Sequence, residues 1–133
     1  MESSAELFAK YSRQIDQEFS TTVRNPTGRP SRGRQILRAY KQVAVSNEDI
    51  VELTLYYVSA VLSFMEAFGI LEDSYFKTVE SAFREAAEVA AAHNLVDQLA
   101  GSFEHVIDES ANVSDDLASA LRDVVARNGF NFA

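Results

Sequence analysis

Apolar residues recur every three or four positions along most of this chain. The first such stripe follows Ser3 and Glu6, which have the spacing of a capping box, and it continues to Val23. Pro26 and Gly28 then interrupt the periodicity. No segment alternates apolar and polar residues for long enough to form a strand. The pattern therefore predicts an all-α protein that begins with a helix of about five turns.

The next two helices have recognisable ends. Pro30 suits the first turn of a second helix, Ser46 suits the N-cap of a third, and Gly69 suits the position just past its C-terminus. The third helix is apolar on nearly every face. That composition is typical of a helix at the centre of a fold or in a dimer interface.

The remainder of the chain is predicted to hold two or three further helices. One begins near Asp73 and either ends at His93 or continues beyond it, and a last helix follows Ser114. We therefore predict one domain over residues 1–133, a bundle of five or six helices in which residues 95–133 form a helical extension. A chain of this length can bury a core, which the 14 aromatic residues help to fill.

Three phenylalanines are predicted to lie in that core. Phe64, Phe83 and Phe103 each fall on the apolar stripe of a different predicted helix. We expect all three side chains to be buried.

Charge is unevenly distributed along the chain. Residues 24–41, the basic segment, hold six Lys and Arg and no acid, whereas residues 42–133 hold 16 acids and four bases. Residues 25–33 contain the Gly and Pro content of a loop. The arginines there, with the free N–H groups of a helix N-terminus, are suited to phosphate. The candidate partner- or anion-binding residues are Arg29, Arg32, Arg34, Arg38 and Lys41.

Three interpretations of the basic segment stay open. It is either a structural element that pairs with acidic neighbours, a site for a protein or small anion, or a nucleic-acid site. The acidic remainder of the chain would repel a polyanion, which disfavours nucleic acid.

Sequence patterns of catalytic and cofactor sites are missing. The chain has no cysteine, no phosphate-binding glycine loop and no Glu-x-x-His pair. An enzyme that uses Glu104, His105 and Asp108 is a third, weaker hypothesis. We expect no catalysis, no metal and no cofactor.

The N-terminus lacks the basic start and apolar run of a signal peptide. Glu66 and Glu72 close the most apolar segment, so no stretch is expected to reach the length of a membrane span. These features predict a cytoplasmic protein without a membrane association.

Residues 36–93 resemble the N-terminal helical domain of RsbU-type serine phosphatases, which act in bacterial stress responses by partner switching. The resemblance lies in a basic amphipathic helix over 36–41, the junction and acidic helix start at 45–53, and an Ala-rich helix that ends at His93. Thr54 stands where that family often has histidine, and no phosphatase domain follows. The resemblance implies a four-helix module that homodimerises and binds a switch-kinase-like protein.

A dimer is also predicted from the third helix itself. Val51, Leu55, Val58 and Leu62 lie off its main apolar stripe and are the candidate dimer interface. The alternative is that the helices after Leu95 cover this face within one chain. The sequence thus predicts a non-enzymatic regulatory protein-binding module, with an anion- or nucleic-acid-binding regulator as the alternative.

Overall fold

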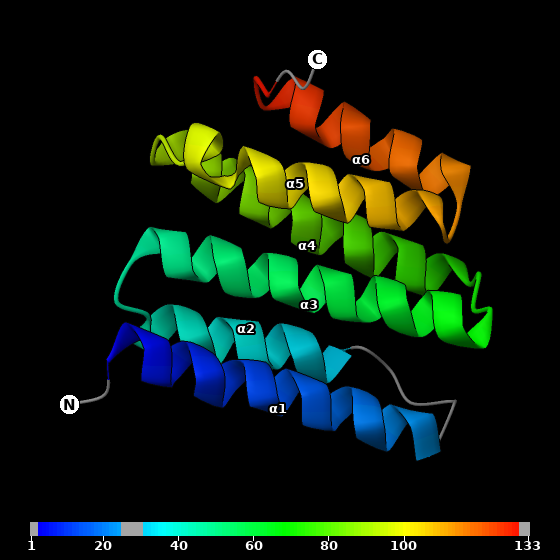
Figure 1. Ribbon diagram of the computed structural model, residues 1–133, viewed down its shortest axis with the longest axis horizontal. Helices are drawn as coiled ribbons and strands as arrows, with labels where there is room; N and C mark the ends of the chain where they lie inside the picture. The colour runs from blue at the N-terminus through cyan, green and yellow to red at the C-terminus, as the bar shows by residue number, and fades with distance from the viewer. Residues whose placement is uncertain (1–2, 25–30, 131–133) are drawn as a thin grey trace.

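The computed structural model describes residues 3–24 and 31–130, with all their side chains except those of residues 20–24 and 31–32. Over these ranges the chain forms α-helices and no strand, which confirms the predicted all-α bundle. The helices, labelled in Figure 1, are α1 (Ser4–Arg24), α2 (Ser31–Val43), α3 (Asn47–Phe68), α4 (Asp73–Ala92), α5 (Val96–Ala111) and α6 (Asp115–Arg127).

Local sequence determines where α3 and α6 begin and where α3 ends. The Ser46 Oγ accepts a hydrogen bond from the Asp49 N–H at 3.2 Å. Gly69 has the left-handed φ of 61° that a helix C-terminus favours, and Ser114 caps α6 through the Leu117 N–H. The predicted boundaries at these positions are confirmed.

The chain breaks between α4 and α5, which settles the open question at His93. Asn94 adopts a left-handed φ of 57°, and the Leu95 N–H bonds back to the Ala90 carbonyl at 2.9 Å. Asparagine tolerates this conformation better than most residues. The described chain therefore contains six helices rather than five.

Helix α3 is the centre of the bundle. Four helices, α1, α2, α4 and α5, pack on it, and α6 packs on α4 and α5. In Figure 1, α1 and α2 lie on one side of α3, α4 and α5 lie on the other, and α6 forms the far edge. This position explains why α3 is apolar on almost every face.

Helices α1, α3 and α5 run in the same direction. Contacts near the start of α1 join it to the start of α3, through Ser4 and Asp49, and later ones join Phe19 to Phe64. They form the nearer layer of Figure 1, while α2 and α4 run in the opposite direction behind them. In this nearer layer, α3 therefore lies between α1 and α5.

Aromatic contacts join the C-terminal part of the chain in the core. The rings of Phe83 and Phe103 are 5.2 Å apart and nearly perpendicular, and Phe130 lies 5.2 Å from Phe103. Phe64, Phe83 and Phe103 are all buried, as predicted.

Helix α2 approaches α3 closely because Gly33 has no side chain. A Cβ atom at Gly33 would lie 2.1 Å from Cε2 of Tyr57, much closer than two carbons can approach. The buried Tyr57 ring therefore occupies the space above this glycine. Gly33 is required by packing.

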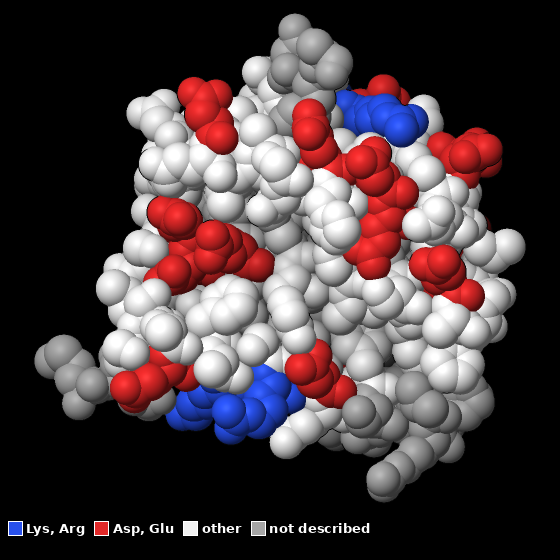
Figure 2. Space-filling view, viewed as in Figure 1, with Lys and Arg blue, Asp and Glu red and all other residues white. Residues whose placement is uncertain are grey.

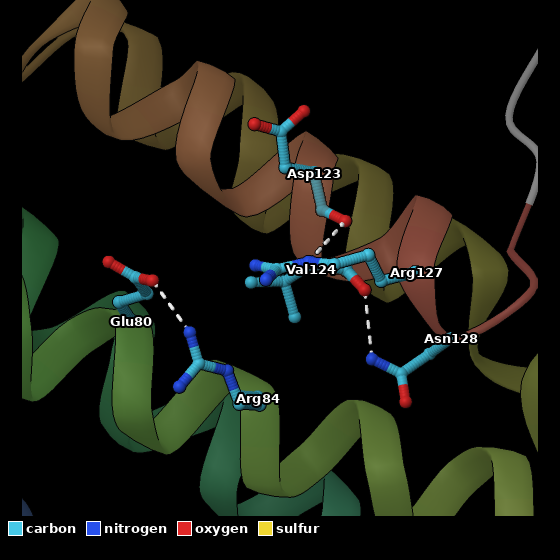
Figure 3. Close-up of polar contacts among 6 residues, drawn as sticks. All are labelled: Glu80, Arg84, Asp123, Val124, Arg127 and Asn128. Atoms are coloured by element: carbon cyan, nitrogen blue, oxygen red, sulfur yellow. Dashed lines mark hydrogen bonds and ion pairs between the residues drawn. The ribbon is translucent and has the colours of Figure 1, made fainter.

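Partly buried polar contacts lie on α4 and at the end of α6 (Figure 3). Arg84 pairs with Glu80 one turn earlier at 2.7 Å. The Asn128 side chain donates to the Val124 carbonyl at 2.8 Å and satisfies a carbonyl of the last turn. These contacts stay within their own helices and do not join one helix to another.

Among the described residues, α3 is the one helix long and apolar enough to cross a membrane by length and composition. The prediction that no segment reaches this length is therefore wrong for α3. More than half of that segment is buried within the bundle.

Candidate binding groove

A groove of about 410 Å³ opens between α1 and α5, with α3 as its floor. Leu55 and Val106 form its buried apolar base, and Phe8 and Tyr56 form an aromatic wall. The other lining residues are polar or small: Glu52, Ser59, Gly101, Ser102 and His105.

Hydrogen bonds between helices fix both sides of the groove. The Tyr56 hydroxyl of α3 donates to Asp16 of α1 at 2.6 Å. One turn beyond Ser59, the Ser63 hydroxyl donates to Glu109 of α5 at 2.7 Å. Hydrogen bonds thus connect α3, the floor of the groove, to α1 on one side and to α5 on the other.

Gly101 is notable because nothing in the fold requires a glycine there. It lies inside α5, and a Cβ built on it would meet no atom within 4 Å. Glycine within a helix is less favourable than alanine by about 1 kcal/mol. Its absent side chain leaves open space in the groove wall.

Negative charge is concentrated near one end of the groove. Partial burial raises the pKa of Glu52 above its usual value, and repulsion from Glu48 and Asp49 raises it further. None of the nine lining residues is Lys or Arg. Figure 2 shows this face of the molecule, on which acidic side chains clearly outnumber basic ones.

Two tyrosines, one in the aromatic wall and one behind it, have raised pKa values. The hydrogen bond to Asp16 is the main cause that raises the pKa of Tyr56 to about 12. Behind Phe8, burial raises the pKa of Tyr40 to about 12, with a further contribution from Asp49 and Glu52. Both phenols therefore stay neutral at physiological pH.

The three residues of the enzyme hypothesis do not form a buried site. The His105 side chain is 78% exposed, and its Nε2 lies 4.0 Å from Glu109 Oε2. Glu104 and Asp108 are exposed. Across residues 3–24 and 31–130, no group of three His, Cys, Asp or Glu side chains could hold a metal ion.

The basic segment is divided by the structure. Arg34 forms an ion pair with Glu85 of α4 at 3.2 Å, so this arginine has an acidic partner within the chain. Arg38 and Lys41 are exposed on α2. Arg29 and the side chain of Arg32 lie outside the described residues. Arg34, Arg38 and Lys41 all belong to α2, which lies outside the groove lining.

The reasoning behind the predicted dimer interface is wrong. Val51, Leu55, Val58 and Leu62 are at most 4% exposed within a single chain. The helices that pack on α3 already cover them, so they need no second subunit for burial. Self-association itself stays a prediction, and it would have to use other residues.

Sequence reasoning missed the groove. Phe8 belongs to an ordinary apolar stripe, and Tyr56, Ser59 and Ser102 carry no motif. The usable signal was Gly101, an unfavourable residue in the middle of a helical pattern.

Comparison of this chain with protein-family profiles, with curated proteins and with solved structures finds no match.

Proposed function

We propose that this chain is a non-enzymatic, cytoplasmic protein-binding module of a regulatory pathway, and that the groove between α1 and α5 is its docking surface. The observation that carries the proposal is the open groove itself, with aromatic and aliphatic residues beside Gly101. Binding surfaces commonly combine a desolvated apolar centre with a polar rim. The groove has both.

The aromatic wall supports binding of another protein. Tyrosines supply large contact areas and are enriched among the residues that dominate binding energy. Tyr56 is held in place by its bond to Asp16, so little side-chain entropy is lost when a partner covers it. A preorganised aromatic wall of this kind supports binding of a partner protein.

The resemblance to partner-switching domains supports the same class of function. It spans α2, α3 and α4 and implies a helical module that binds a protein and performs no catalysis itself. Under this proposal, regulation consists of occupying or vacating the groove.

Matched baits test the proposal. The full chain, the Gly101→Leu variant and the Arg38→Ala/Lys41→Ala variant are used to capture proteins from the native host, and mass spectrometry identifies those bound. A partner should be lost with Gly101→Leu, because the new side chain enters the open groove, and kept with the α2 variant. Calorimetry with the purified partner should reproduce this difference.

The opposite outcome is equally clear. Equal capture by the wild type and Gly101→Leu rejects the groove as the docking surface. Loss confined to the Arg38→Ala/Lys41→Ala variant would instead favour an anion-binding role for α2.

A further inference from the structure

We infer that the occupant of the groove is a cationic amphipathic α-helix of a partner protein. This inference rests on the proposed function and specifies the chemistry of the partner.

The helical form follows from the architecture. Residues 3–24 and 31–130 contain no strand, so they offer no sheet edge to which an extended peptide could add. The groove runs beside three parallel helices, α1, α3 and α5. A helix laid over α3 between α1 and α5 would pack on the half-buried rings of Phe8 and Tyr56.

Small groove residues allow such a helix to approach. Ser59, Gly101 and Ser102 lie around the groove on α3 and α5. A helix can approach closely where the facing side chains are small, and Gly101 has none. This gives the unfavourable glycine a function that packing within the chain does not supply.

The positive charge of the occupant follows from the carboxylates along the groove. Glu52 lies at one end beside Glu48 and Asp49, and none of the residues that line the groove is Lys or Arg. One turn beyond the residues that line the groove, Glu109 has one oxygen bonded to Ser63, and its buried Oε2 has no hydrogen-bond partner and lies 4.0 Å from the His105 imidazole. A lysine or arginine near each end would face an acidic group.

The spacing of these acids sets the spacing of the expected cations. Ser63, which holds Glu109, lies eleven residues beyond Glu52 on α3, a rise of about 16 Å along the helix. An occupant helix aligned with α3 should therefore carry Lys or Arg about eleven residues apart, with apolar residues on the same face between them.

Synthetic helical peptides provide the probe. One peptide of about 18 residues carries two lysines eleven positions apart on an apolar face of Leu and Ala, and its matched control carries glutamates at those two positions. Fluorescence anisotropy with the full chain at low salt should show the lysine peptide binding about tenfold more tightly. Its affinity should fall with added salt.

Variants of the chain locate the interaction. Glu52→Gln should weaken the lysine peptide severalfold and leave the glutamate peptide no weaker. Gly101→Leu should abolish binding of the lysine peptide, while circular dichroism shows unchanged helix content. Glu88→Gln, an exposed substitution on α4, is the matched control and should have no effect.

Three outcomes would overturn the inference. If both peptides bind equally, or neither binds while Gly101→Leu still removes the captured partner, the groove docks a protein of other chemistry and the proposed function survives. If light scattering shows a dimer that Gly101→Leu dissociates, the occupant is a second copy of this chain. If capture is also insensitive to Gly101→Leu, the proposed function fails as well.

Discussion

Two glycines inside helices, Gly33 in α2 and Gly101 in α5, have opposite surroundings. At Gly33 the Tyr57 ring fills the space that a side chain would need, whereas the space over Gly101 is open. The first glycine permits a contact within the chain, and the second leaves a gap on its surface. The same residue type thus marks a packed contact in one region and an open surface in the other.

The difference extends to the faces of α3 and α5. The face of α5 that carries Phe103 packs against Phe83 and Phe130, while the face that carries Ser102 borders the groove. The loss of stability on substitution should therefore be large at the packed face of α5 and small at the face that borders the groove. The predictions below test this difference.

The largest expected effect is on the packed face of α5. Phe103→Ala should lower the free energy of unfolding by about 3–5 kcal/mol, because it leaves a cavity among fully buried rings. Ser102→Ala, one position away on the groove side, should change it by less than about 0.5 kcal/mol. Urea denaturation measures both. Similar losses for the two variants would show that the groove face is also part of the core.

The next effect is at the packed contact of Gly33. Gly33→Ala should destabilise the chain by about 1–3 kcal/mol, because its Cβ would collide with the Tyr57 ring and force α2 and α3 apart. Near-ultraviolet circular dichroism should report the altered environment of the tyrosine. A variant as stable as the wild type would mean that α2 is not held against Tyr57.

Structure that depends on interactions within one turn of the chain can be predicted from the sequence better than structure that depends on distant contacts. The ends of α3 could be predicted because Ser46 and Gly69 act on backbone groups within one turn. The break at Asn94 stayed open in the sequence, because a helix pattern continues on both sides of it. The predicted burial of Phe83 followed from helical periodicity alone.

Contacts between residues far apart in the chain, including those that form the groove, could not be predicted from the sequence. Arg34 pairs with Glu85, 51 positions away, and nothing in the basic segment indicates which acid it meets. Val58 was assigned to a dimer because the sequence does not show how many helices surround α3. The groove arises where α1 and α5 both lie on α3, a juxtaposition that no single periodic stripe contains.

A smaller effect of opposite sign is expected at the open glycine. Gly101→Ala should raise the free energy of unfolding by up to about 1 kcal/mol, since alanine favours the helix and meets no neighbour. Thermal and urea denaturation should both detect the gain. Destabilisation would indicate that the groove wall is already filled in the folded chain.

The smallest effect concerns Glu52, the carboxylate at the groove. Its pKa is raised in the folded chain by partial burial and by Glu48 and Asp49, so the folded state binds more protons than the unfolded state between the usual carboxyl pKa and the raised value. Stability from this group is therefore lost as pH rises through that window. Glu52→Gln should remove the loss, and its advantage over the wild type should grow across the window and stay constant above it.

An NMR titration of the Glu52 carboxyl carbon measures the pKa directly, and the lysine peptide connects it to the groove. A bound cation favours the ionised carboxylate and lowers the pKa, so binding within the window should release protons that calorimetry in buffers of different ionisation enthalpy detects. A pKa at or below 4.5 in the free chain would contradict the raised pKa expected for Glu52. If peptide binding releases no protons within this pH window, the lysines of the peptide bind away from Glu52.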